Sequence, residues 1–61
     1  MLNRYSVFLK NNSIAQVYGT GYFKDSDTVW FYYEDGNSKC FIAEFVRNQV
    51  DGIVLDRKEF D

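Results

Sequence analysis

Short runs of β-branched and aromatic residues, separated by clusters of Asn, Asp, Ser and Gly, follow one another along the chain. Such runs are typical of β-strands, and such clusters are typical of the turns between them. Proline, which is rare inside sheets, is absent. We therefore expect an all-β protein, either a small five-stranded antiparallel meander or a half-open barrel. The predicted strands lie at residues 4–10, 14–23, 28–34, 39–46 and 50–56.

The length of 61 residues predicts a single small β domain spanning residues 1–61. A chain of this size buries only about 60% of the surface that its unfolded form exposes. Cys40 is the only cysteine and histidine is absent, so neither an internal disulfide nor a tetrahedral zinc site is expected. We expect no metal and no cofactor, and stability must come from packing or from self-association.

Three turn motifs organise the predicted strands. Two glycines at 19 and 21 predict a bulge or bend within the second strand rather than a phosphate-binding loop. The Asp-Ser-Asp sequence at 25–27 is interpreted as a turn, because the glycine and glutamate of a calcium loop are missing. A two-residue loop at Gly36 and Asn37 predicts a hairpin that places Glu34 opposite Lys39.

This predicted hairpin is apolar on both faces, although a sheet with one solvated side should alternate apolar with polar residues. Side chains alternate along a strand, which assigns each residue to a face. One face carries Trp30, Tyr32, Phe41, Ala43 and Phe45, and the other carries Val29, Phe31, Tyr33, Cys40 and Ile42. Two interpretations stay open: the sheet curls tightly and buries the rings, or one face is an interface.

The interface hypothesis selects the face with the large aromatic residues, because Trp and Tyr are enriched at binding hot spots. The predicted partner-binding residues are Trp30, Tyr32, Phe41 and Phe45, and Phe8 could extend this face. The opposite face, which carries smaller residues, is expected to belong to the core. It would pack there against Tyr5, Val7 and Leu9 of the first strand.

The chain offers little chemistry for catalysis, and we do not expect an enzyme. Histidine, the usual general base, is absent. Cys40 is interpreted as a small buried hydrophobe rather than a reactive thiol, and the acidic residues cluster at turns. A net charge of −2 disfavours nucleic acid as a partner. The chain shows neither a signal peptide nor a membrane-spanning stretch, so we expect a soluble, cytoplasmic protein.

Two resemblances can be identified. Residues 43–53 (AEFVRNQVDGI), about a fifth of the chain, resemble the end of an SH3-like barrel. The proline and acidic loop of ligand-binding SH3 domains are missing, so polyproline binding is not implied. The layout is also similar to that of short phage and mobile-element proteins of Gram-positive bacteria, which implies an accessory factor acting on another protein. The similar segments are 5–11 (YSVFLKN), 31–36 (FYYEDG), 42–45 (IAEF) and 50–53 (VDGI).

The leading hypothesis is a non-enzymatic protein-binding module, of phage or mobile-element origin, that binds and modulates a host or viral protein through the aromatic hairpin face. One alternative is a self-assembling structural protein, a homo-oligomer built through the same face or a strand edge. Another is a small β-barrel that binds single-stranded nucleic acid. Its stacking residues would be Tyr18, Tyr22, Trp30 and Tyr32, and its phosphate-binding residues Arg4, Lys10, Lys24 and Lys39.

Overall fold

The computed structural model describes residues 2–60, with side chains described for residues 2–58. The described chain is all-β, which confirms the predicted fold class. It contains six strands rather than five, because Thr20 divides the long second run in two. The strands are β1 (Leu2–Leu9), β2 (Ile14–Gly19), β3 (Gly21–Lys24), β4 (Thr28–Asp35), β5 (Ser38–Val46) and β6 (Val50–Phe60), with a 3₁₀ helix η1 (Arg47–Gln49) before β6.

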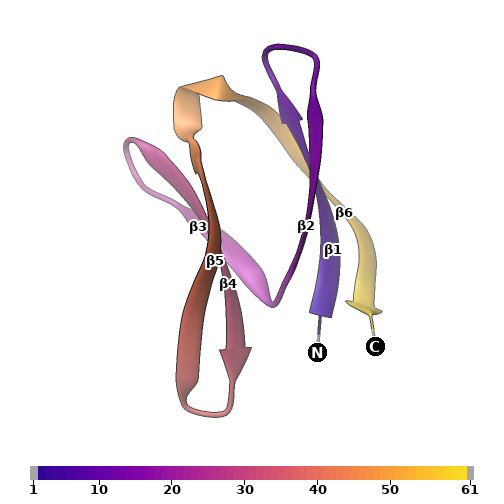
Figure 1. Cartoon of the computed structure of the whole chain (residues 1–61), viewed down its shortest axis with the longest axis vertical. Coiled ribbons are helices and arrows are strands. Elements are labelled where there is room, and N and C mark those ends of the chain that lie inside the picture. Colours follow the sequence, from indigo (N-terminus) through magenta and orange to yellow (C-terminus); the bar gives the residue numbers. More distant parts are fainter. Residues whose placement is uncertain (1, 61) are drawn as a thin grey trace.

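The strands form two separate antiparallel sheets of three strands each. One has the order β2-β1-β6 and the other the order β3-β4-β5. Figure 1 shows β4 and β5 on one side of the molecule, and β1 and β6 on the other. The chain crosses between the sheets twice, from β2 to β3 and from β5 through η1 to β6. The described strands are not hydrogen-bonded into a closed barrel.

The first crossing lies at the predicted bend. The Thr20 backbone N–H donates to the Tyr32 carbonyl at 2.8 Å, and the Thr20 hydroxyl accepts from the Glu34 N–H at 2.9 Å. A Cβ atom at Gly19 would lie 2.8 Å from the Tyr32 carbonyl oxygen, so only glycine fits there without a shift. The glycine pair therefore marks a close approach between β2 and β4, which confirms the prediction of a bend.

The core lies between the two sheets and is small, as the chain length requires. Val7 of one sheet and Val29 and Phe31 of the other are fully buried. The rings of Tyr5 and Phe31 meet across the interface, with centroids 5.4 Å apart. Val17 is also buried, and the residues packed around this centre are Leu9, Ala15, Ala43, Phe45, Val50 and Ile53. The predicted core face of the first strand is thus confirmed.

Two hairpin loops have the backbone that their residues predict. Asn12, in the turn after β1, has a positive φ of 68°, which asparagine tolerates better than most residues. Gly36, in the loop between β4 and β5, has a φ of 60°. Glu34 pairs with Lys39 and Asp35 with Ser38, which confirms the predicted loop and its register at this end of the hairpin.

Farther along the same hairpin the register shifts. Tyr32 pairs with Phe41 but Phe31 pairs with Ala43, which leaves Ile42 as the extra residue of a β-bulge. The bulge moves Phe45 to the face of Val29 and Phe31, and its ring packs edge-on against Phe31 at 5.8 Å. The prediction that Phe45 shares a face with Trp30 is therefore wrong.

Two expectations about core residues are also wrong. Cys40 is exposed rather than buried, because it lies in the part of β5 that extends past the edge of the core. Ile42 at the bulge is also exposed. Figure 1 shows this end of the β4–β5 hairpin projecting beyond the other strands. The projecting end of the ribbon has no second sheet to cover it, which leaves Cys40 exposed. Ile42 still approaches Gly19 of β2 with its Cδ1 atom.

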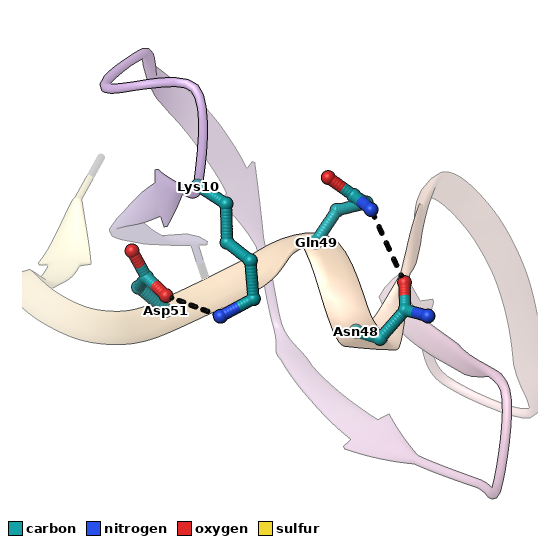
Figure 2. A network of polar contacts seen from close by, with 4 residues as sticks. All are labelled: Lys10, Asn48, Gln49 and Asp51. Carbon is teal, nitrogen blue, oxygen red and sulfur yellow. Dashed lines mark hydrogen bonds and ion pairs between the residues drawn. The ribbon is translucent and has the colours of Figure 1, made fainter.

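Polar contacts fix the second crossing between the sheets. The Lys10 backbone N–H donates to the Gln49 carbonyl at 2.9 Å, and the Lys10 ammonium group contacts the Asp51 carboxylate at 2.8 Å. Figure 2 shows this ion pair beside the Gln49–Asn48 side-chain contact of η1. The ion pair is exposed and contributes little stability by itself.

Within residues 2–60, no helix has the length and apolar character needed to span a membrane.

Candidate functional site

Four aromatic side chains gather on the face of the β3-β4-β5 sheet that points away from the core. We call them the aromatic cluster: Phe23, Trp30, Tyr32 and Phe41. Because side chains alternate along β4, the burial of Val29 and Phe31 directs Trp30 and Tyr32 to the opposite face. Phe23 is the cross-strand partner of Trp30, and Phe41 is the cross-strand partner of Tyr32. The cluster therefore spans all three strands of this sheet.

The rings of the aromatic cluster are in mutual contact. Phe41 lies 5.4 Å from Trp30 and 5.9 Å from Phe23, measured between ring centroids. Phe23 lies 6.5 Å from Trp30 and 6.4 Å from Tyr32. All four separations fall within the range of about 4.5–7 Å in which aromatic pairs attract each other. The cluster is thus one continuous apolar surface rather than four isolated rings.

Asp25 holds Trp30 in place. The indole Nε1–H donates to one carboxylate oxygen of Asp25 at 3.1 Å. The other oxygen accepts the backbone N–H groups of Asp27 and Thr28, at 3.0 and 2.8 Å. The hydrogen bond from Trp30, followed by the two backbone hydrogen bonds, lowers the pKa of the Asp25 carboxyl group below its ordinary value. Both oxygens of this exposed carboxylate are engaged, so Asp25 orients the indole and closes the turn.

Gly21 and Lys39 hold the ring of Tyr32 from two sides. A Cβ atom at position 21 would lie 2.7 Å from the Tyr32 hydroxyl oxygen, so the absent side chain of Gly21 makes room for the ring. The Lys39 ammonium nitrogen lies 4.5 Å from the ring centroid, within the distance of a cation–π interaction. The tyrosine ring therefore packs over a glycine and also contacts a cation of its own chain.

The cluster faces solvent despite its apolar character. Phe41 is 54% exposed and Phe23 is 42% exposed, whereas Trp30 and Tyr32 are partly buried by their neighbours. Next to the cluster is a hollow of about 230 Å³, lined by Trp30, Phe41, Ile42, Ala43 and Glu44. A contiguous exposed apolar surface on a small protein generally marks an interaction site. The arrangement can bind an apolar group or a group that stacks on aromatic rings. The residues of the cluster include no nucleophile–base pair.

The structure brings together three of the five predicted partner-binding residues: Trp30, Tyr32 and Phe41. Phe45 lies in the core, as described above. Phe8 is exposed, but it belongs to the other sheet, where it pairs with Ile14 and Gly52. It therefore does not extend the aromatic cluster.

Sequence reasoning missed Phe23, the fourth member of the cluster. The turn chemistry of Asp25 contained the signal for it. The Asp25 N–H donates to the Thr28 carbonyl and closes the turn, so Lys24 pairs with Val29 and the next pair places Phe23 opposite Trp30. Counting back from the turn would have found the residue. A single continuous strand over residues 14–23 leaves Phe23 without a partner in the third predicted strand.

The residues of the nucleic-acid hypothesis are not gathered on one surface. Tyr22 packs against Tyr5 and Phe31, with centroids 5.5 and 5.3 Å apart. Tyr18 pairs with Arg4 in the other sheet, and only Trp30 and Tyr32 belong to the aromatic cluster.

Across the described residues, no three acidic or cysteine side chains come close enough together to hold a metal ion.

No protein-family model, curated protein or solved structure matches this chain. The similarity to SH3-like barrels and to phage accessory proteins therefore stays a prediction. The function is inferred from the geometry of the aromatic cluster, which combines solvent exposure with side chains held in defined orientations.

Proposed function

We propose that this protein is a non-enzymatic protein-binding module that docks its partner on the aromatic cluster. The observation that carries the proposal is the exposure of Phe23 and Phe41 beside a Trp30 ring that Asp25 orients. Rings held in place before binding lose little conformational freedom when a partner covers them. Because these rings are exposed in the free protein, burying them stabilises a complex with a partner more than it stabilises the fold.

The magnitudes support a protein partner. Fully burying one large apolar side chain stabilises by about 1.5–3 kcal/mol. The exposed parts of four rings could therefore supply several kcal/mol when covered, the scale of a small hot spot. Trp and Tyr are over-represented at such sites because they combine a large area with a polar group. In the free protein, the indole N–H already has its partner in Asp25, so docking need not break a hydrogen bond.

The biological setting that fits this module is that of an accessory factor from a phage or mobile element. In this setting the protein works in the cytoplasm and modulates a host or viral protein. This setting is the one that the resemblance of residues 5–11 and 31–36 implies, and the exposed aromatic cluster is the surface that such a factor would use. A half-open SH3-like barrel would be a suitable scaffold, with η1 as the turn before its last strand.

The test is quantitative affinity capture from lysate of the cells that make the protein, comparing three forms of the bait. The first is the wild type, and the second is the double variant Phe23→Ser/Phe41→Ser. The control is Ile14→Ser/Val54→Ser, which removes two equally exposed apolar residues from the other sheet. Circular dichroism establishes that all three baits are folded.

We expect a captured protein that is lost with the cluster variant and kept with the control. A partner that is retained by the cluster variant, or lost equally with both, contradicts the proposal. Light scattering during gel filtration addresses self-assembly. A dimer that dissociates only in the cluster variant would show that the partner is a second copy of this chain, and a host or viral partner would then not be needed to explain the surface.

A further inference from the structure

The hollow beside the aromatic cluster has a chemical character that the proposed function leaves open. Its lining includes two rings, those of Trp30 and Phe41, and one carboxylate, that of Glu44, beside Ile42 and Ala43. Glu44 is the direct cross-strand partner of Trp30. Directly opposed residues of an antiparallel pair have Cβ atoms about 4.5–5.5 Å apart. The carboxylate and the indole ring can therefore contact the same ligand group.

The Glu44 carboxylate is available for such a ligand. Within the described part of the chain it has no ion-pair or hydrogen-bond partner. The other carboxylate near the cluster, that of Asp25, is already occupied by the indole and two backbone N–H groups. Glu44 is thus the free negative charge at the rim of an aromatic surface.

The cluster already binds one cation at its other end. Lys39 places its ammonium nitrogen 4.5 Å from the Tyr32 ring centroid. A cation is attracted to the face of an aromatic ring by the ring quadrupole, most strongly by tryptophan. The hollow offers the stronger ring, Trp30, together with a carboxylate, and none of the described residues that line it carries a positive charge.

The hollow is small and open to solvent. Its volume of about 230 Å³ is below the range of about 300–1,000 Å³ that is typical of small-molecule sites. A single side chain is the better match. Among cationic side chains, arginine has a planar group that stacks on aromatic rings and donates two parallel hydrogen bonds to a carboxylate.

We propose that the hollow formed by Trp30, Phe41 and Glu44 accepts an arginine side chain of the partner protein. The guanidinium group stacks on the indole ring and pairs with the Glu44 carboxylate. Charge complementarity and the size of the hollow carry the proposal, which rests on the proposed function and specifies the partner's contact residue. It predicts that the partner presents an arginine within an otherwise apolar patch.

The test uses Trp30 as its reporter, since it is the only tryptophan in the chain. Its fluorescence is titrated with three capped tripeptides, Gly-Arg-Gly, Gly-citrulline-Gly and Gly-Lys-Gly, at constant ionic strength. Citrulline has nearly the shape of arginine but no charge. The Glu44→Gln variant removes the carboxylate. The matched control is Asp35→Asn, which removes the same charge from an exposed position five residues along β4 from Trp30.

We expect saturable binding of the arginine peptide, with the citrulline peptide weaker by about tenfold and Glu44→Gln weakening the arginine peptide about three- to fivefold. Asp35→Asn should leave the affinity unchanged. Equal binding of the citrulline or lysine peptide overturns the assignment to arginine, and an unchanged affinity in Glu44→Gln overturns the role of the carboxylate. If the peptides fail while capture still depends on Phe23 and Phe41, only the arginine site is refuted and the docking surface stands.

Discussion

Two phenylalanines on β5, four residues apart, should respond very differently to truncation. The bulge at Ile42 places Phe45 against Phe31 in the core, whereas Phe41 lies on the outer face with 54% of its surface exposed. Without the bulge both would share one face. Comparing Phe41→Ala with Phe45→Ala therefore tests the register and the identity of the exposed face together.

The expected magnitudes follow from the two environments. Truncating a buried phenylalanine to alanine costs about 3–5 kcal/mol, and Phe45, which is partly buried, should fall near about 3 kcal/mol. Phe41 is less than half buried, so the transfer free energy lost in Phe41→Ala is about 1 kcal/mol. A domain of 61 residues has a total stability of about 3–9 kcal/mol, calculated at about 0.05–0.15 kcal/mol per residue. Phe45→Ala should therefore remove between about a third and all of this stability, whereas Phe41→Ala should keep most of it.

Urea denaturation followed by far-UV circular dichroism measures both costs. Trp30 fluorescence is unsuitable for this comparison, because Phe41 touches the indole and its removal would change the signal directly. With a urea dependence of about 1 kcal/mol per molar for so small a chain, the midpoint should fall by about 1 M in Phe41→Ala and by about 3 M in Phe45→Ala. Equal losses in the two variants would refute the register and show that the outer face is core.

Three further predictions concern single positions. Gly19→Ala should destabilise by about 1–3 kcal/mol, because its Cβ would meet a β4 carbonyl, whereas Gly52→Ala, with open space around it, should be neutral; thermal melts compare the two. Folding lowers the pKa of Asp25, so the unfolded chain binds more protons at this carboxyl group than the folded protein does. The stabilising effect of Asp25 is therefore full above the ordinary pKa of 3.8 and is lost as the pH falls through the lowered pKa. An Asp25→Asn variant whose stability falls equally over that pH range would contradict this. Cys40 should react with a thiol reagent in the native protein as fast as in the unfolded chain, and slow reaction would show that it is covered.

The strands and turns of this fold could be predicted because their signals are local. Asn12 and Gly36 have the backbone conformations that their residue types favour, and the two-residue loop fixed the pairing of Glu34 with Lys39. The division of the second strand at Thr20 was marked by its flanking glycines. The core face of the first strand followed from simple alternation, because Tyr5 and Val7 are buried and Leu9 packs against them.

The composition of the exposed face could be predicted only in part, because it depends on a bulge. Bulges are commonly marked by glycine, and β5 contains none. One extra residue at Ile42 was enough to send Phe45 to the core. The position of Phe8 depends on the packing of the two sheets against each other, and the exposure of Cys40 depends on how far a hairpin projects. Neither is a local property of the sequence.

A partner protein that docks as we propose covers the aromatic cluster and, with it, Trp30. Because Trp30 is the only tryptophan, protein labelled with 5-fluorotryptophan gives a single ¹⁹F resonance from the middle of this surface. When the unlabelled captured partner is added, we predict that this resonance shifts. We also predict that its chemical shift no longer differs between H₂O and D₂O, because the partner excludes solvent from the ring. A resonance that keeps its position and its solvent sensitivity in the saturated complex would show that the partner binds elsewhere.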